Sequence, residues 1–194
     1  MGMTETANPP ATRRFTADEV WKMVEIGLLG EDEPYELLDG ELLYMSPQGE
    51  SHAKVITRLN MFFAAQYGPS GHAVRVQMPV GGIIDSIPEP DLVVVTLDVA
   101  EQDGRPEPEQ AVLLVEVAVT SQPRDRRKGV IYATAGASEY WLVDIPRDVV
   151  TVHTGHAEDG TWHEVREIGI DGALTLPGTE VTITVAAILR PSRR

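Results

Sequence analysis

A carboxylate in the middle of an apolar strand constrains the fold of this chain more than any other feature of its sequence. The run Val112–Val119 is apolar throughout except for Glu116. A segment of this kind is typical of a strand that is buried on both faces. An isolated ionised carboxylate inside a core is costly unless a cation, hydrogen bonds or a metal compensates its charge. Glu116 therefore predicts a compensating partner in the folded core.

The order of the residues offers two partners for Glu116. Pro90-Asp91 opens a second apolar run, Leu92–Val95, and a polar loop separates the two runs. If the two strands pair antiparallel, Asp91 lies beside Glu116, and two converging carboxylates are typical of a Mg²⁺ or Mn²⁺ site. The other partner is Lys128, on the segment that follows the second strand. Either partner would compensate the buried charge.

The segment Pro123–Ala135 is predicted to form a helix that presents Lys128. Polar residues precede it as caps, and Gly136 is a natural stop at its end. Lys128 shares a helix face with Tyr132, four residues on, and with Asp125, three residues back. The pattern predicts an ammonium group aimed at the carboxylates. Asp125 would hold this group in place, and Tyr132 would pack or hydrogen-bond beside it.

A set of short motifs follows one another along the chain in a specific order, although each motif alone is weak. The motifs are Tyr35–Leu42, Ser46-Pro47 with Glu50 and His52, Pro90-Asp91, Val115-Glu116-Val117, Asp125 with Lys128 and Tyr132, and Gly136–Asp144. Together they strongly resemble the Uma2 family (DUF820), a bacterial group of restriction-endonuclease-like proteins in the PD-(D/E)XK nuclease superfamily. The resemblance covers roughly Phe15 to Gly155.

The resemblance implies an α/β (α+β) fold of the restriction-endonuclease-like type. Its core is a mixed central sheet flanked by helices in the order αβββαβ, with an N-terminal helix plus hairpin and a C-terminal β extension. It also implies an endonuclease that hydrolyses phosphodiester bonds in DNA, uses Mg²⁺ or Mn²⁺ and forms homo-oligomers such as dimers. Residues 15–190 are predicted to be one domain with its core at about 49–145, between a disordered segment 1–14 and a tail 191–194.

The same resemblance assigns roles to the residues around Glu116. Asp91 and Glu116 take the metal-ligand positions, and the backbone carbonyl of Val117 takes a further one. The wider superfamily has its catalytic lysine two residues after the glutamate, where this chain has Ala118. The Uma2 family commonly has a lysine on the following helix instead, so Lys128 takes the catalytic role. It then either reaches the same point in space or only neutralises Glu116.

Three further residues are candidates for the outer part of the site. Glu50 and His52 lie near the start of a predicted helix, where an acid often assists metal binding in this superfamily. The helix dipole alone also favours an acid at that place, and His52 is equally well explained by a structural role. Glu36 flanks the Asp39-Gly40 turn of a predicted hairpin. It has either a metal role or an exposed strand position.

Hydrophobic periodicity and turn residues predict the remaining elements. The predicted helices are a short one that Thr16 caps and one over 49–67. The predicted strands are 74–80, 92–95, 112–119 and 139–145, with hairpins over 35–45, over 149–154 with 162–168, and over 173–175 with 181–183.

The charge of the whole chain opposes a nucleic-acid partner. Its 16 Lys and Arg stand against 30 Asp and Glu, the net charge is −14, and the pI is about 4.7. A field of this sign repels DNA, although the basic cluster Arg124–Lys128 can still bind phosphate locally. DNA binding is therefore expected to be weak, metal-dependent and sensitive to salt.

Several function classes lack support. The chain has no cysteine, which excludes disulfides, thiolate metal sites and cysteine nucleophiles. No apolar stretch reaches the ~20 residues of a membrane span and no signal peptide is evident, so a cytoplasmic location is expected. The alternative to an endonuclease is a catalytically weak or inactive nuclease-like module that binds nucleic acid or protein. In that case Glu116, Lys128 and Asp125 form a buried ion-pair network.

Overall fold

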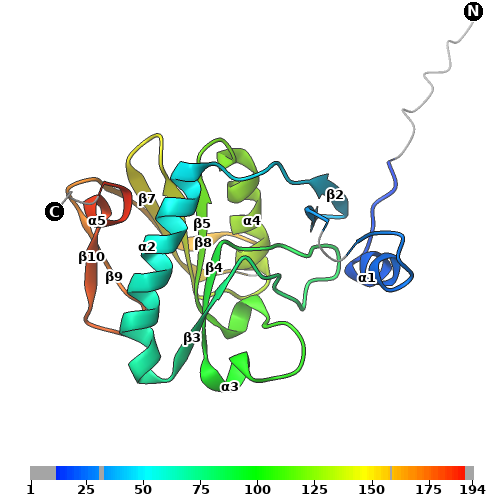
Figure 1. Ribbon diagram of the computed structural model, residues 1–194, viewed down its shortest axis with the longest axis horizontal. Coiled ribbons are helices and arrows are strands. Elements are labelled where there is room, and N and C mark those ends of the chain that lie inside the picture. Colours follow the sequence, from blue (N-terminus) through cyan, green and yellow to red (C-terminus); the bar gives the residue numbers. More distant parts are fainter. Residues whose placement is uncertain (1–11, 31–32, 158, 191–194) are drawn as a thin grey trace, which may run out of the picture.

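A six-stranded mixed sheet forms the centre of the computed structural model, which describes residues 12–30, 33–157 and 159–190 (Figure 1). The strands are β3 (His72–Val76), β4 (Leu92–Thr96), β5 (Ala111–Ala118), β6 (Glu139–Asp144), β7 (Val149–His156) and β8 (Trp162–Gly169), side by side in this order. Neighbouring strands are antiparallel except β5 and β6, which are parallel. A parallel pair needs a crossover connection, and a helix between β5 and β6 supplies it.

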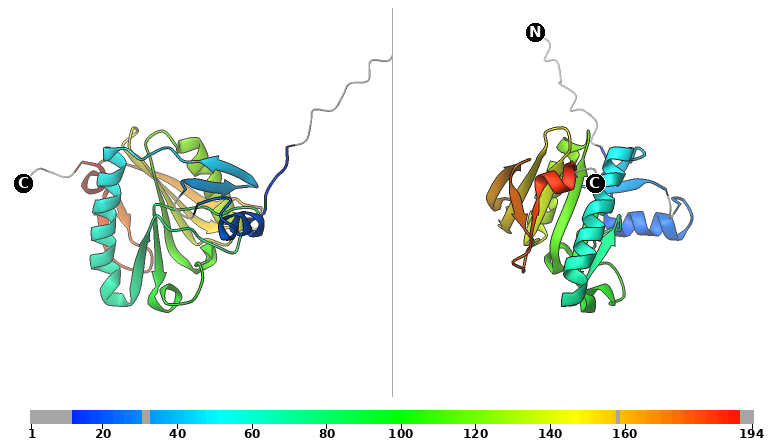
Figure 2. Two further views of the ribbon diagram at one scale, coloured as in Figure 1. Left: turned by 45° about the vertical axis from the view of Figure 1, so that its right-hand side comes forward. Right: turned by 60° about the vertical axis from the view of Figure 1, so that its left-hand side comes forward.

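Two helices cover the two faces of this sheet. One is α2 (Glu50–Tyr67), and the other is the crossover helix α4 (Gln122–Thr134). Along β4, Leu92 and Val94 pack in the cluster beneath α2, whereas Val93 and Val95 pack in the cluster on the α4 side. Successive side chains of a strand point to opposite faces, so a strand covered on both sides is apolar throughout. Figure 2 (left) shows α2 standing against one side of the sheet.

A small N-terminal unit packs against the loop that leads into β4. It consists of α1 (Ala17–Glu25) and the hairpin of β1 (Tyr35–Leu38) and β2 (Glu41–Tyr44). The hairpin turn has positive φ at Asp39 and Gly40, +46° and +78°. A two-residue turn of this kind matches the twist of the flanking strands, as the sequence predicted. Leu37 bridges to Ile87, which brings β1 beside the start of β4.

The C-terminal part returns to the α2 side of the sheet. There the short strands β9 (Ala173–Thr175) and β10 (Thr182–Thr184) form a hairpin, and α5 (Val185–Leu189) packs beside α2. Buried side chains of this part, Leu174, Leu176, Val185 and Ile188, complete the core beneath α2. None of the described helices is both long enough and apolar enough to cross a membrane.

Some predicted elements differ from the observed ones. The strand predicted over 74–80 runs from His72 to Val76, because Gln77 has φ +50° and leaves the strand conformation. The polar loop before β5 contains α3 (Leu97–Ala100) and a 3₁₀ turn, Pro108–Gln110; a second such turn, Gly68–Ser70, follows α2. Residues 1–11 of the predicted disordered segment 1–14, and the predicted tail 191–194, lie outside the described residues.

Candidate active site

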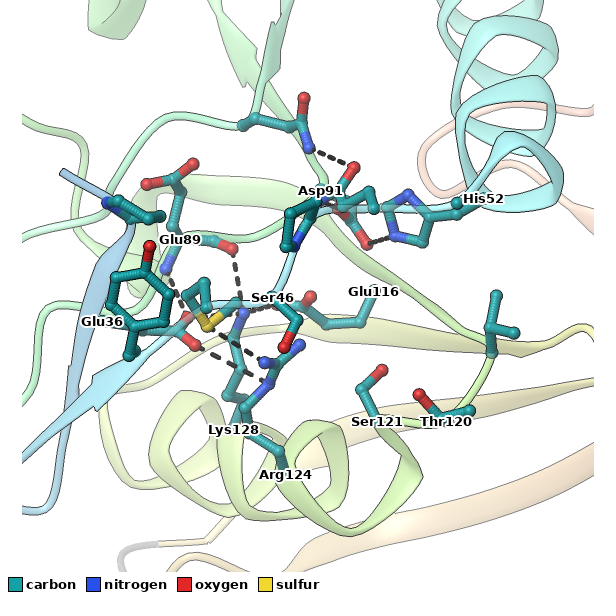
Figure 3. Close-up of a pocket in the computed structure, with 18 of the residues that line it drawn as sticks. Glu36, Ser46, His52, Glu89, Asp91, Glu116, Thr120, Ser121, Arg124 and Lys128 are labelled. Atoms are coloured by element: carbon teal, nitrogen blue, oxygen red, sulfur yellow. Dashed lines mark hydrogen bonds and ion pairs between the residues drawn. The ribbon is translucent and has the colours of Figure 1, made fainter. Parts of the chain in front are cut away.

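A cavity of about 720 Å³ opens where the hairpin, the start of α2, the Pro90-Asp91 segment, β5 and α4 meet. Polar side chains from each of these elements line it, and Figure 3 shows how they converge. They include Glu36, Ser46, Gln48, His52, Glu89, Asp91, Glu116, Thr120, Ser121, Arg124 and Lys128.

Asp91 lies beside Glu116 because β4 and β5 pair antiparallel, with Leu92 opposite Val115. This is the convergence that the sequence predicted. One oxygen of Asp91, Oδ2, accepts a hydrogen bond from the Val117 N–H at 2.8 Å and lies 3.0 Å from His52 Nε2. Two partners on one oxygen fix the carboxylate of Asp91 at the end of α2.

Glu116 is 3% exposed and faces the cavity from the middle of β5. Its Oε1 accepts a hydrogen bond from the Tyr132 hydroxyl at 2.8 Å and lies 2.5 Å from Lys128 Nζ. Burial raises the pKa of Glu116 well above its ordinary value, the charge of Lys128 opposes that rise, and the neighbouring carboxylate of Asp91 adds to it. Glu116 therefore binds a proton more readily than an exposed carboxylate does.

Lys128 is 1% exposed, and its ammonium group is fully coordinated by the protein. Its Nζ lies 2.5 Å from Glu116 Oε1 and 2.7 Å from Glu36 Oε1, and it donates to the Glu89 carbonyl at 2.9 Å. Burial alone would lower the pKa of Lys128, but the charges of Glu116 and Glu36 outweigh burial and raise it. Two ion pairs and one hydrogen bond thus surround an ammonium that has three N–H groups. In the structure Lys128 neutralises two buried carboxylates at the lining of the cavity.

Glu36 is buried, so the alternative of an exposed strand position was wrong for this residue. β1 packs against the loop before β4, and that contact turns the side chain of Glu36 inward, where its Oε1 also accepts the Glu89 N–H at 2.9 Å. Arg124 Nε lies 3.8 Å from Glu36 Oε2. One hydrogen bond and the two nearby cations, Lys128 and Arg124, make Glu36 the counter-ion that the hairpin supplies to α4.

Two candidates lie elsewhere than the sequence suggested. Asp125 is buried, but among the described residues its ion pair is with Arg124 at 3.5 Å, and it makes no direct contact with Lys128. Asp125 therefore acts on Lys128 through its charge and not through a direct contact. Glu50 has a side chain that is 82% exposed and pairs with Lys54, so the structure does not bring it to the cavity. Its position in the first turn of α2 accords with the dipole alternative.

The backbone of Val117 lies within the core, and Val117 is not among the residues that line the cavity. Two cavity residues, Glu89 and Arg124, were not among the candidate catalytic or metal-binding residues. Glu89 lines the cavity, and partial burial, together with the charge of Glu36, raises its pKa. Arg124 belongs to the basic cluster. Its place in the first turn of α4 was the sequence signal that it would line the cavity.

Two members of the basic cluster Arg124–Lys128, Arg127 and Lys128, are engaged in contacts within the protein. Arg127 donates to Asp39 Oδ2 at 2.5 Å, to Glu41 Oε2 at 2.9 Å and to the Leu38 carbonyl at 2.7 Å, so it clamps the hairpin to α4. Lys128 is buried. Of the four basic residues, Arg124 and Arg126 remain for an outside partner.

The cavity carries an excess of negative charge. Five acidic residues gather around two cations, Lys128 and Arg124; the acids are Glu36, Glu89, Asp91, Glu116 and Asp125. Crowded carboxylates are stabilised by protonation or by a bound cation. The cluster therefore has the electrostatics of a cation site.

The free oxygens fit a hard divalent cation. Glu116 Oε2 accepts no hydrogen bond from the described residues, and Asp91 Oδ1 has only a long one from Gln48 at 3.5 Å. Within the described part of the chain, no group of three or more His, Asp or Glu is arranged to hold a metal by itself. Mg²⁺ is commonly bound by one or two carboxylates with water and substrate phosphate as the other ligands. The donor set suits that mode of binding.

The order α2-β3-β4-β5-α4-β6, around one parallel strand pair, defines a restriction-endonuclease-like fold with the acidic cavity at one edge of its core. The chain belongs to the Uma2 family, whose model, described as putative restriction endonuclease, matches residues 21–186. The family and the fold that the sequence predicted are thus confirmed.

The comparison with solved structures gives two similar chains, of which the first shares the fold. A putative nuclease belonging to DUF820 from Anabaena variabilis has 18% sequence identity and a TM-score of 0.71, over 90% of this chain and 97% of the other. The type IIG restriction endonuclease BpuSI has 17% identity and a TM-score of 0.37, over 58% of this chain and 13% of the other. No curated protein matches the chain.

Proposed function

We propose that the protein is a metal-dependent endonuclease that hydrolyses phosphodiester bonds in DNA with Mg²⁺ or Mn²⁺. The observation that carries this proposal is the convergence of Asp91 and Glu116 in an open cavity whose acids outnumber its cations. Buried carboxylates in such excess are costly without a cation, and membership of the Uma2 family supports phosphodiester chemistry.

Asp91 and Glu116 would hold the divalent cation. When bound, such a cation polarises the scissile phosphate and lowers the pKa of a water molecule. His52 and the Val117 N–H keep Asp91 in place, while Tyr132 and Lys128 keep Glu116 in place. The oxygen of water adds to phosphorus as the bond to the leaving oxygen breaks, which gives one phosphomonoester and one hydroxyl end.

Two basic residues of α4, Lys128 and Arg124, have different proposed roles. Lys128 acts as a positioning residue, because its three N–H groups are occupied by Glu116, Glu36 and the Glu89 carbonyl. Arg124 lines the cavity with a side chain that is 32% exposed, and its Nε has no hydrogen bond among the described residues. A guanidinium in this position can bind a phosphate oxygen. DNA binding through so few cations is expected to be weak and salt-sensitive.

Asp91→Asn should reduce cleavage of plasmid or single-stranded DNA by at least about 100-fold, because the neutral amide is a poor ligand for Mg²⁺. Cleavage is measured on gels in Mg²⁺ and in Mn²⁺, and Mn²⁺ binding is measured by calorimetry. Glu50→Gln is the matched control. It removes a carboxylate from the first turn of α2, close in sequence to His52, but this carboxylate lies outside the cavity. Equal cleavage by Asp91→Asn and the wild type would refute the proposed site.

The affinity for Mn²⁺ should rise with pH. Burial raises the pKa of Glu116 from its ordinary value of 4.5, so the cation and a proton compete for this carboxylate. Between about pH 6 and about pH 8, the Kd should fall by up to about tenfold per pH unit, with release of a proton that calorimetry in different buffers detects. A Kd independent of pH would contradict the role of Glu116.

The metal-free protein should show the opposite trend. A carboxyl whose pKa is raised by folding binds its proton more tightly in the folded state than in the unfolded state. The resulting stability is fully present below pH 4.5 and is lost as the pH rises through the raised pKa. The melting temperature without metal should therefore fall as the pH increases above about 5, and Mn²⁺ should restore it most strongly at high pH.

The second candidate function is an interaction module without turnover. The observation that favours it is the complete coordination of Lys128, which gives a closed ion-pair network without any metal. Such a module would bind nucleic acid or protein equally well in EDTA. Persistence of DNA binding after chelation, together with absent cleavage in Mg²⁺ and Mn²⁺, would establish this alternative.

A further inference from the structure

The outer edge of β8 is open. β8 is the last strand of the six-stranded sheet, and among the described strands it pairs with β7 alone. Within the described residues, no backbone hydrogen bond joins β8 to an element beyond its outer edge. Figure 2 (right) shows the orange strands of this end of the sheet at the margin of the molecule. The backbone groups on this edge are therefore available to another strand.

β8 carries charged side chains, which keep away strands of like charge, but it is neither short nor interrupted as protected edge strands often are. It is eight residues long and contains no proline, and its pairing with β7 keeps one register along its length. Most of its side chains are exposed, including the apolar Val165 at 55%. The opposite edge strand, β3, has only five residues, and all of them are half-buried. β8 is the better surface for strand addition.

The sequence of β8 is complementary to itself. If a second β8 runs antiparallel with Val165 opposite Val165, then Glu164 lies opposite Arg166, and Arg166 lies opposite Glu164. In the same register the exposed Val165 lies opposite its own copy. Residues directly opposite each other on two strands lie on one face and are in contact distance. The Glu164–Arg166 pair therefore joins unlike charges, and the two-fold symmetry makes this pair occur twice.

We propose that β8 is a homodimer interface, in which two copies of this chain pair their β8 edges antiparallel about Val165 and form one continuous sheet. In the single chain, Glu164 Oε1 lies 3.0 Å from Arg166 Nε, and both side chains are more than half exposed. In the dimer, Glu164 of each copy would pair with Arg166 of the other copy, in place of or in addition to Arg166 of its own chain. The proposed interface consists of β8 and includes no residue of the acidic cavity. It gives a location for the homo-oligomer contact that the family resemblance implied.

The test reverses the charges at the two positions. Glu164→Arg places two arginines opposite each other, and Arg166→Glu does the same with two glutamates. Each single variant should raise the dimer dissociation constant by at least about tenfold, measured by sedimentation velocity at low salt. The double variant Glu164→Arg/Arg166→Glu exchanges the charges and should return the dissociation constant to that of the wild type.

A mixture of the two single variants provides the decisive measurement. Glu164→Arg and Arg166→Glu place unlike charges opposite each other in both halves of a mixed dimer, so the mixture should dimerise where each variant alone does not. Glu180→Arg, an exposed reversal outside β8, is the control for net charge and should leave the dimer unchanged. Circular dichroism confirms that each variant is folded.

Three results would overturn the proposal: a wild type that stays monomeric at about 100 μM, single variants that dimerise as the wild type does, or a mixture that stays monomeric. The readout is molecular mass, so it does not depend on catalysis. A monomeric variant that still cleaves DNA would leave the endonuclease assignment intact, and a dimer without cleavage would leave the interface intact.

Discussion

Glu116→Gln is expected to reduce metal-dependent cleavage by at least about 100-fold, yet to leave the metal-free protein as stable as the wild type or more stable. Burial raises the pKa of Glu116, so at neutral pH the folded protein must either keep this carboxyl protonated or bear a costly buried charge. Glutamine has the same shape and still accepts the hydrogen bonds of Tyr132 and Lys128. It cannot supply a charged ligand to a cation.

The free energy of unfolding, measured with urea in EDTA at about pH 8, should be unchanged or rise by about 1–2 kcal/mol in Glu116→Gln. Added Mn²⁺ should stabilise the wild type and not the variant. Glu139→Gln is the matched control, because partial burial raises the pKa of Glu139 as well and Glu139 lies outside the cavity. A loss of more than about 1 kcal/mol in Glu116→Gln would show instead that the ion pair with Lys128 is a net stabiliser.

Lys128→Met should destabilise the protein by about 3–5 kcal/mol, because it leaves Glu36 and Glu116 buried without their common cation. Methionine fills nearly the same volume, so packing is preserved and the loss reports the uncompensated charge. The variant should also lose cleavage, since Glu116 would no longer be held in place.

The double variant Lys128→Met/Glu36→Gln separates these effects. Removing the charge of Glu36 should recover more than half of the lost free energy of unfolding, measured with urea at about pH 7, because Glu116 can then be protonated. Lys54→Met is the control, since Lys54 is exposed on α2 and pairs only with Glu50. If Lys128→Met costs less than about 1 kcal/mol, water or another cation reaches the two carboxylates.

Much of the core could be predicted because it depends on local patterns. The apolar runs around Leu92–Val95 and Val112–Val119 predicted strands buried on both faces, and the structure places clusters on both sides of them. The Asp39-Gly40 pair predicted a tight hairpin turn because few residues tolerate two successive positive φ angles. Antiparallel pairing of the two apolar strands then required Asp91 to lie beside Glu116.

The environment of the charged side chains could not be predicted in the same way. Glu36 alternates with apolar residues in β1 like any exposed strand position, and only the docking of β1 on the loop before β4 buries it. Glu50 and His52 are two residues apart at the start of α2, but only His52 faces the cavity. Asp125 and Lys128 share a helix face, yet each finds its partner elsewhere.

The amino-acid sequence was sufficient to predict the main strands, the crossover helix, the hairpin turn and the approach of Asp91 to Glu116. These follow from side-chain periodicity, turn conformation and chain order, which act over a few residues or along one strand pair. The packing of distant segments was needed to place Glu36 beside Lys128 and to join Arg127 to the hairpin. Arg127 contacts residues 86 to 89 positions away. The electrostatic energy of a charge depends on its distance to every neighbour and on burial, and folding alone sets both.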